Sequence, residues 1–331
     1  MARYFLTGVA GFIAARVAEF LLDSGNTVIG VDNMNDAYDV RMKDYRLGKL
    51  IDRKGFSFWK VDISDRDDLW RVFQTEFGQN GDVHCDAIIN LAARAGVRQS
   101  VEDPWVYVDT NITGTLNLLE LCRSYEINKF ILASTSSTYG SEAPLPTPET
   151  SNTDLPLQPY AATKKGAEVL AHAYHYLYGI DVTVFRYFTV YGPAGRPDMV
   201  MFRLAKWIHE GKIVQVNGDG EQSRGFTYVD DIARGTILGL KPLGYQVINL
   251  GGHETVKINE LINLFESLIG QEARIQHHPA HPADMRANWA DVEKADELIG
   301  WRPEVSLREG IANLITWYQA ERAWVSQIQI D

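Results

Sequence analysis

Short apolar runs alternate with amphipathic stretches through the first half of the chain. Six runs are apolar almost throughout and are predicted as strands: residues 4–6, 27–31, 56–61, 87–91, 130–132 and 182–185. The stretches between them, such as residues 12–24 and 110–125, repeat apolar residues at helical spacing. Because strands buried on both faces belong to parallel sheets covered by helices, this alternation predicts a doubly wound parallel sheet, the Rossmann type of α/β fold.

A second, smaller lobe is expected after this region. Beyond about residue 186 the alternation weakens, and proline, glycine and arginine become frequent. We predict a Rossmann domain over residues 1–185, to which the chain returns at about residues 226–252. Residues 186–225 and 253–331 would form a C-terminal α/β lobe that binds the substrate. A chain of 331 residues is long enough for two such units.

Composition argues against several kinds of partner. The net charge of −11 disfavours nucleic acid, because binding a phosphate backbone requires a basic face. No apolar run approaches the roughly 18 residues of a membrane span, and the first residues lack the apolar core of a signal peptide. The two cysteines, Cys85 and Cys122, lie among apolar residues and are interpreted as reduced. We therefore expect a cytoplasmic protein with neither a disulfide nor a bound metal.

The first predicted strand leads into a glycine-rich turn, Gly8-x-x-Gly11-x-x-Ala14. Glycines there allow a tight turn and a close approach of the backbone to a pyrophosphate at the helix N-terminus. Taken alone, the pattern fits an ordinary strand–helix turn equally well. The next strand ends at Asp32, whose carboxylate could bind an adenosine ribose and would repel a 2′-phosphate. Because no arginine follows immediately, the pattern favours NAD over NADP.

Tyr160 and Lys164 are four residues apart, so a helix would present them on one face. An ammonium group beside a phenol lowers the phenol pKa and lets tyrosine act as a base nearer neutral pH. The same spacing also occurs on ordinary amphipathic helices. However, the hydroxyl-rich segment 133–140, Ala-Ser-Thr-Ser-Ser-Thr-Tyr-Gly, follows the fifth strand and precedes this pair. The glycine turn, the hydroxyl segment and the Tyr/Lys pair, in this order, are far less expected by chance than any one of them alone.

These motifs resemble those of the extended short-chain dehydrogenase/reductase family, and within it the nucleotide-sugar epimerases. The resemblance extends from residue 5 to about residue 317 and includes segments 7–13, 91–93, 111–115, 134–140, 159–164 and 218–224. Segments 32–39, 95–98, 134–140, 186–193 and 196–199 are similar in particular to UDP-glucuronate 4-epimerases. The resemblance implies an NAD-dependent isomerase that inverts C4 of UDP-glucuronate to give UDP-galacturonate.

The resemblance also implies the residues that carry the chemistry. Tyr160 would be the base at the sugar 4-hydroxyl, Lys164 would hold the nicotinamide ribose and lower the Tyr160 pKa, and Thr135 would help relay the proton. Besides Tyr160 and Lys164, the residues expected to bind NAD are Gly8, Gly11, Phe12, Ile13, Asp32, Asn33, Asp62, Ile63, Leu91, Ala92, Ala93, Asn111 and Tyr187. For Asp62 alone, a solvated strand end is a competing interpretation.

A glucuronate substrate needs its carboxylate held firmly, because the 4-keto form is a β-keto acid that loses CO2 when the C5–C6 bond aligns with the carbonyl. Neutral donors can hold it while its charge stays localised, and Ser136, Ser137 and Thr189 are expected to do so. The other residues expected to bind the substrate are Arg98, Arg196, Arg224, Asp284 and Arg286. For any single arginine, the alternative is an ordinary surface ion pair.

Related enzymes fit the sequence less well. Nucleotide-sugar 4,6-dehydratases have Asp-Glu after the catalytic threonine, where this chain has Ser136 and Ser137. Glucuronate decarboxylases differ around Tyr160 and Arg186. A 4-epimerase of a neutral UDP-hexose or UDP-N-acetylhexosamine is the nearest alternative. A non-catalytic NAD-binding regulator is another, although it has no need of Thr135, Tyr160 and Lys164 together.

The chain departs from the family pattern at Asn90, Arg94, Asn217, Gly225 and His281. These changes leave the predicted chemistry intact, and the identity of the nucleotide and of the sugar is less firmly predicted because of them. A homodimer is expected by analogy, formed by the helix over residues 110–125 and the helix that follows Tyr160.

Overall fold

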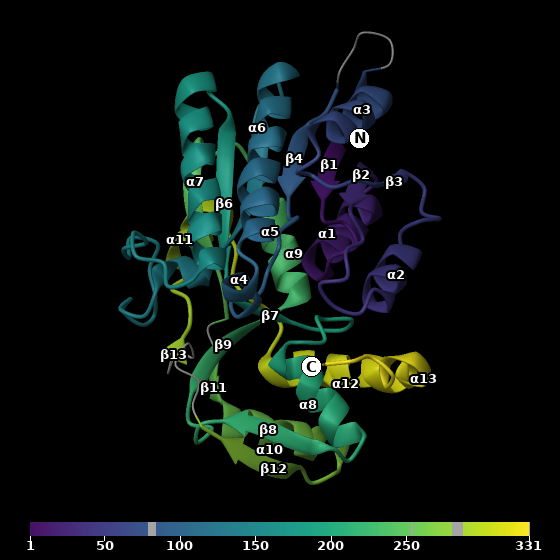
Figure 1. Cartoon of the computed structure of the whole chain (residues 1–331), viewed down its shortest axis with the longest axis vertical. Helices are drawn as coiled ribbons and strands as arrows, with labels where there is room; N and C mark the ends of the chain where they lie inside the picture. Colours follow the sequence, from purple (N-terminus) through teal and green to yellow (C-terminus); the bar gives the residue numbers. More distant parts are fainter. Residues whose placement is uncertain (79–83, 253, 280–286, 331) are drawn as a thin grey trace.

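The computed structural model describes residues 1–78, 84–252, 254–279 and 287–330. A seven-stranded sheet with the strand order β10-β6-β5-β4-β1-β2-β3 forms the upper part of the molecule in Figure 1. Every neighbouring pair in it is parallel. Its strands are β1 (Arg3–Thr7), β2 (Thr27–Asp32), β3 (Phe56–Lys60), β4 (Ala87–Asn90), β5 (Lys129–Thr135), β6 (Asp181–Tyr187) and β10 (Tyr245–Leu250). All six predicted strands are present, and the predicted Rossmann fold is confirmed.

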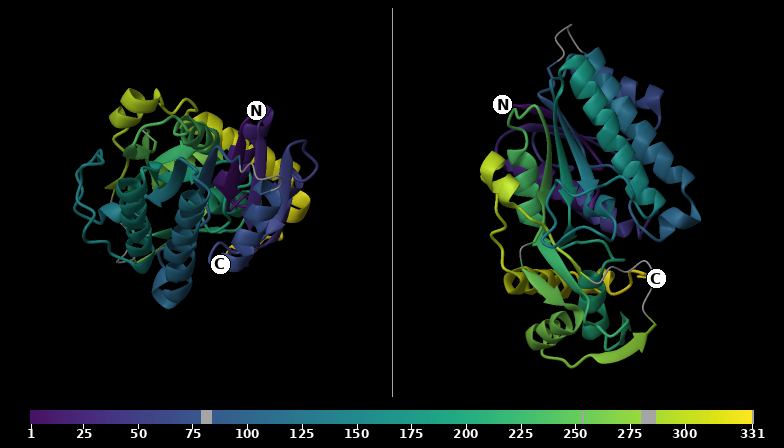
Figure 2. Two further views of the ribbon diagram at one scale, coloured as in Figure 1. Left: turned by 90° about the horizontal axis from the view of Figure 1, so that it is seen from above. Right: turned by 90° about the vertical axis from the view of Figure 1, so that its left-hand side faces the viewer.

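Helices cover both faces of this sheet (Figure 2, right). Alternate residues of β1 face opposite sides, so Phe5 and Leu6 belong to different apolar clusters. The helices on the Phe5 side are α3 (Arg66–Phe77), α6 (Gly114–Ser124) and α7 (Pro159–Tyr178). Those on the Leu6 side are α1 (Phe12–Asp23), α9 (Val229–Leu238) and α11 (Glu293–Ile299). The near-continuous apolar strands of the sequence are explained by this burial on two sides.

The lower part of Figure 1 has its own apolar core. Its helices are α8 (Val200–His209), α10 (Ile258–Ile269), α12 (Leu307–Ala320) and α13 (Arg322–Val325), and α2 (Arg41–Gly48) contributes Met42 to the same core. Around β9 (Ser223–Tyr228) pair β7 (Thr189–Tyr191), β11 (Thr255–Lys257) and β13 (Ala287–Asn288), while β8 (Ile213–Asn217) pairs with β12 (Arg274–His278). This part packs below the carboxyl ends of the parallel strands.

Four short helical segments follow strands β4 and β5. The helix predicted over residues 110–125 begins earlier, as α5 (Trp105–Tyr107) and the π-helical segment η2 (Val108–Thr113), and continues into α6. Before it lies α4 (Gln99–Glu102), and the 3-10 helix η3 (Ser136–Tyr139) follows β5 directly. The hydroxyl-rich segment is therefore half strand and half helix, and it turns at Thr135.

Within the described residues, no helix is both long enough and apolar enough to cross a membrane.

Candidate active site

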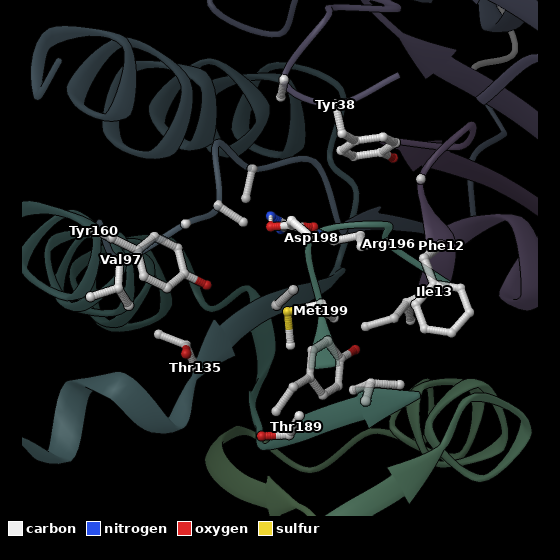
Figure 3. A pocket seen from close by; sticks show the side chains of 18 of the residues that line it. Phe12, Ile13, Tyr38, Val97, Thr135, Tyr160, Thr189, Arg196, Asp198 and Met199 are labelled. Atoms are coloured by element: carbon white, nitrogen blue, oxygen red, sulfur yellow. Dashed lines mark hydrogen bonds and ion pairs between the residues drawn. The ribbon is translucent and has the colours of Figure 1, made fainter. Parts of the chain in front are cut away.

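A cavity of about 730 Å³ lies between the carboxyl ends of the parallel strands and the lower part of the molecule. Tyr160 and Thr135 lie on one side of it, Phe12 and Ile13 lie on the opposite side, and Arg196 and Asp198 lie between them (Figure 3). The strands β1, β4, β5 and β6 all end at this cavity, so residues far apart in the sequence meet there.

The glycine turn forms one wall of the cavity. Gly8 has φ +70°, and a Cβ atom there would lie 2.8 Å from the Ala92 Cα atom. A Cβ atom at Gly11 would lie 2.7 Å from the Gly8 carbonyl oxygen. Gly11 is also the N-cap residue of α1, and no described side chain caps that helix end. Its first amide groups are therefore available to an anion, which fits the pyrophosphate of a dinucleotide.

Asp32 ends β2 at the same wall and is held firmly. Its carboxylate accepts hydrogen bonds from the backbone amides of Ala10 at 3.2 Å and Met34 at 2.8 Å. The buried ammonium group of Lys43 lies 3.4 Å from it and also donates to Asn35. A carboxylate at the end of the second strand fits an adenosine ribose, and the nearby lysine compensates the cost of burying its charge.

Asp62 is linked to the same region by Asn33, whose side-chain amide donates to it at 2.6 Å. Burial would raise the pKa of Asp62, but hydrogen bonds from Ser64 and Asn33 bring it below its ordinary value. Asp62 and its neighbour Ile63 both line the cavity. The side chain is thus fixed beside the cavity and is not a freely solvated strand end.

Thr135, Tyr160 and Lys164 converge on the side of the cavity opposite the glycine turn. Thr135 is the last residue of β5, and the other two lie in the first turns of α7. Burial raises the pKa of Tyr160, and the nearby Thr135 hydroxyl and Arg196 guanidinium offset this effect only in part. These effects together leave the pKa of Tyr160 above its ordinary value, so they do not by themselves make Tyr160 a base near neutral pH. That Lys164 lowers the pKa of Tyr160 stays a prediction.

Lys164 is a buried cation whose side chain faces the cavity. The residue is 2% exposed, and within the described chain its ammonium group makes no hydrogen bond. Burial lowers its pKa to about 8, against the opposing effect of the Glu168 carboxylate. Because the ammonium group faces the cavity without a partner in the described chain, its position fits a hydrogen bond to a ligand such as the nicotinamide ribose.

A buried ionic cluster supports Lys164 and Thr135 from behind. Glu168, one helical turn after Lys164, accepts two hydrogen bonds from Arg186 at 3.0 and 2.7 Å. It also accepts one from the Ser134 hydroxyl at 2.5 Å. The cluster ties α7 to the ends of β5 and β6, so it fixes the relative position of the two elements that carry the predicted catalytic groups.

Hydroxyl groups form the wall next to Thr135. Ser136, Ser137 and Thr189 all line the cavity, and their predicted contact with the carboxylate stays a prediction. The Thr135 hydroxyl donates to the Ser137 hydroxyl at 3.2 Å and accepts from the Ser137 amide at the same distance. Neutral groups therefore make up this wall.

Three of the four predicted arginines line the described part of the cavity. Arg196 forms two hydrogen bonds with Asp198, at 3.0 and 2.7 Å, so it brings its own counter-ion to the site. Arg224 lies on β9, where it donates to the Ser223 carbonyl, and Arg98 lies in the loop before α4. The remaining predictions, Asp284 and Arg286, lie outside the described residues, as does His281.

The predicted NAD-binding residues all line the cavity except Asn111. Asn111 is buried, and its side chain accepts from the Arg94 amide and donates to the Arg94 carbonyl and to Thr163. Thr163 lies between Tyr160 and Lys164 on α7. Asn111 thus connects the loop after β4 to the helix of the catalytic pair, and its contacts are with the protein.

Two departures from the family pattern have a packing reason. At Gly225, a Cβ atom would lie 2.7 Å from the Gly252 carbonyl oxygen and 2.8 Å from the Trp289 Cβ atom. Asn90 is fully buried, where it accepts from the Thr7 hydroxyl at 2.8 Å and donates to Thr115 at 3.1 Å. Asn217, the last residue of β8, lines the cavity.

Sequence reasoning missed part of the cavity wall. The missed residues with polar or aromatic side chains include Tyr38, Lys43, Gln99, Arg203, Trp207, Gln215, Gln222 and Asn288. Half of them, Arg203, Trp207, Gln215 and Asn288, come from α8, β8 and β13, where no motif marked them. The buried position of Lys43, on the helix after Asp32, had no signal in the sequence either.

The chain is similar to known proteins over nearly its whole length. The model of the GDP-mannose 4,6 dehydratase family matches residues 5–314. A UDP-glucuronate 4-epimerase of Thermodesulfobacterium geofontis is 52% identical over 331 residues, which is 100% of both chains.

Two solved structures are also similar. The UDP-glucuronic acid 4-epimerase from Bacillus cereus, in complex with UDP-glucuronic acid and NAD, is 35% identical with a TM-score of 0.87, over 96% of this chain and 99% of that one. The UDP-glucose 4-epimerase with UDP-glucose from the hyperthermophilic eubacterium Thermotoga maritima is 31% identical with a TM-score of 0.87, over 97% and 99%.

Proposed function

The chain belongs to the family of GDP-mannose 4,6-dehydratase, and from that premise we propose that it is an NAD-dependent 4-epimerase that converts UDP-glucuronate to UDP-galacturonate. One observation carries the proposal. The Thr135, Tyr160 and Lys164 side chains line the same cavity as the glycine turn, and the neutral hydroxyls of Ser136 and Ser137 lie directly beside them.

The reaction begins at the 4-hydroxyl of the sugar. Tyr160 removes its proton, and Thr135 binds the same hydroxyl so that the proton moves along a short path. Bound NAD supplies the acceptor for the hydrogen of C4 and returns it to the opposite face. Lys164, whose ammonium group faces the cavity, holds the nicotinamide ribose and favours the ionised form of Tyr160. Thr135 and Arg196 add to that effect in the protein itself.

The hydroxyl wall explains how a uronate can be epimerised without loss of CO2. Ser136, Ser137 and Thr189 donate to the carboxylate, keep its charge on the oxygens and fix the rotation about C5–C6. The arginines of the cavity, chiefly Arg224, are left for the diphosphate.

A dehydratase is a poor fit to the same wall. Elimination of water across C5–C6 needs an acid and a base next to the catalytic threonine. The acidic residues that line the described part of the cavity are Asp32, Asp62 and Asp198. The first two lie at the glycine-turn wall, and Asp198 is paired with Arg196.

We also propose which parts of the chain bind the cofactor and the sugar, and that two chains form a homodimer. Residues 1–185 and 226–252 supply most of the NAD-binding groups, and residues 186–225 and 253–331 supply Arg196 and Arg224 for the nucleotide sugar. Ser136 and Ser137 reach the sugar from the first unit, and α11 of the second packs on its sheet. On α7, Val169, Tyr176, Leu177 and Tyr178 are exposed at 57%, 82%, 63% and 50%. A homodimer that packs α6 and α7 against their copies would bury them. We propose a cytoplasmic location, as expected from the sequence.

The test is to incubate the purified protein with UDP-glucuronate, without added NAD, and to separate the nucleotide products by chromatography. UDP-galacturonate is the expected product. A UDP-pentose would identify a decarboxylase instead. Epimerisation of UDP-glucose with no conversion of UDP-glucuronate would identify a hexose epimerase and refute the uronate assignment.

A further inference from the structure

Asn288 is a cavity residue with a fixed backbone that no sequence motif marked. It lies on β13, where it pairs in register with Arg224 of β9. On its other side, the Trp289 carbonyl accepts from the Thr147 amide at 3.0 Å, and the Asp291 amide donates to the Thr147 carbonyl at 3.0 Å. Two separate segments therefore hold the backbone around Asn288.

The Asn288 side chain reaches across the cavity wall to the hydroxyl segment. Its amide nitrogen donates to the Ser136 hydroxyl oxygen at 3.3 Å. A serine hydroxyl has one proton and two lone pairs, so this contact uses a lone pair and leaves the proton to be donated elsewhere. Among the described residues, the Ser136 hydroxyl donates to none. Because Ser136 is 8% exposed and lines the cavity, its proton is directed to a ligand there.

The neighbouring Ser137 hydroxyl also donates to none of the described residues. It accepts from Thr135 at 3.2 Å, but Thr135 has one proton and turns it to the sugar 4-hydroxyl in the proposed reaction, so the Ser137 proton stays available to the cavity while Ser136 is the hydroxyl whose direction Asn288 fixes. The wall thus presents donors. A carboxylate only accepts hydrogen bonds, whereas a hydroxymethyl group both donates and accepts, so a wall of donors favours the carboxylate through charge-assisted bonds.

We infer that Asn288 determines selectivity for a sugar with a carboxylate at C6, because it fixes the direction in which the Ser136 hydroxyl donates. This inference rests on the proposed function and adds a residue to it. Asn288 is a positioning residue and acts through Ser136. An acceptor at position 288 would take the Ser136 proton, turn a lone pair to the cavity and reverse the preference.

Asn288→Asp makes this change with almost no change in shape. The variant is tested in the Tyr160→Phe background, so that no sugar is turned over, with calorimetric titrations of UDP-glucuronate, UDP-glucose and UDP. We expect the dissociation constant of UDP-glucuronate to rise about 10- to 100-fold. That of UDP-glucose should change less than about threefold, and that of UDP should stay constant. An equal change for both sugars, or no change for UDP-glucuronate, would overturn the inference.

A second pair of variants separates positioning through Ser136 from direct effects. Asn288→Ala removes the donor without adding charge and should weaken UDP-glucuronate about three- to tenfold. In a Ser136→Ala background the same change should add less than about twofold, since the shared contact is already lost. Full, independent effects of the two changes would overturn the inference.

The titrations also distinguish failure of the inference from failure of the proposed function. If the Tyr160→Phe parent binds UDP-glucose more tightly than UDP-glucuronate, both fail. If the parent prefers UDP-glucuronate and Asn288→Asp leaves that preference intact, the inference alone fails.

Discussion

Replacement of Lys164 by methionine should stabilise the NAD-free chain near neutral pH while it removes turnover. The lysine is 2% exposed, and its pKa is lowered from 10.5 to about 8 by burial. At about 1.4 kcal/mol per pKa unit, burial of the charged form costs about 3 kcal/mol of folding stability. Methionine has a similar length and no charge, so it avoids this cost.

The pH dependence gives the sharper test. Below pH 8, Lys164 is charged in the folded and unfolded chain, and the folded state bears the whole cost. Between pH 8 and 10.5 the unfolded chain binds the proton and the folded chain does not, so stability of the parent rises with pH. The advantage of Lys164→Met should therefore be largest at pH 7 and decline towards pH 10.

Urea unfolding of both NAD-free proteins at several pH values measures this difference. Lys164→Arg is a matched control that keeps the charge and should show no stabilisation at pH 7. An advantage of methionine that is constant with pH would show that packing causes it. A loss of stability at pH 7 would refute the reasoning that the buried ammonium group is costly and is retained for its function.

Three further changes test other parts of the site. Tyr160→Phe should leave binding of UDP-sugars nearly unchanged in calorimetry while kcat falls about 10²- to 10⁴-fold, and near-normal turnover would exclude the tyrosine as the base. Ser136→Ala combined with Ser137→Ala should lower kcat/KM for UDP-glucuronate about 100-fold or release a UDP-pentose, which chromatography detects. A variant that does neither would show that the two hydroxyls do not bind the carboxylate. Arg46, buried at 3% exposure, donates to the carbonyls of Ala10 at 3.1 Å and Ala194 at 2.9 Å. Arg46→Met should therefore lower the free energy of unfolding in urea by about 3 kcal/mol and lower the NAD content of the purified protein. Unchanged values would show that these contacts contribute little.

The parallel sheet and the glycine-turn wall were predictable from the sequence because local signals coincide there. Strands buried on both faces are apolar at nearly every position, and the turn from β1 to α1 requires glycine at Gly8, where φ is +70°. Thr135, Tyr160 and Lys164 were predictable because strand ends and helix spacing bring them to one edge of the sheet. Their roles stay predictions until variants are measured.

The other side of the cavity was not predictable in the same way. Asn288 reaches Ser136 across 152 positions of the sequence, and its strand β13 has two residues, too short for any periodicity. Lys43 pairs with Asp32 because α2 folds back over the end of β2, a tertiary contact without a motif. The resemblance also placed Asn111 at the cofactor, whereas its side-chain hydrogen bonds are with Arg94 and Thr163.

The central claim is that the protein inverts C4 of UDP-glucuronate with a cofactor that it regenerates. The most direct measurement incubates the protein as purified with UDP-glucuronate that carries deuterium at C4, and examines the product by mass spectrometry and NMR. The account predicts UDP-galacturonate that retains deuterium at C4, because the hydrogen removed from that carbon is returned to it. Loss of the deuterium to water, or recovery of UDP-glucuronate unchanged, would contradict the account.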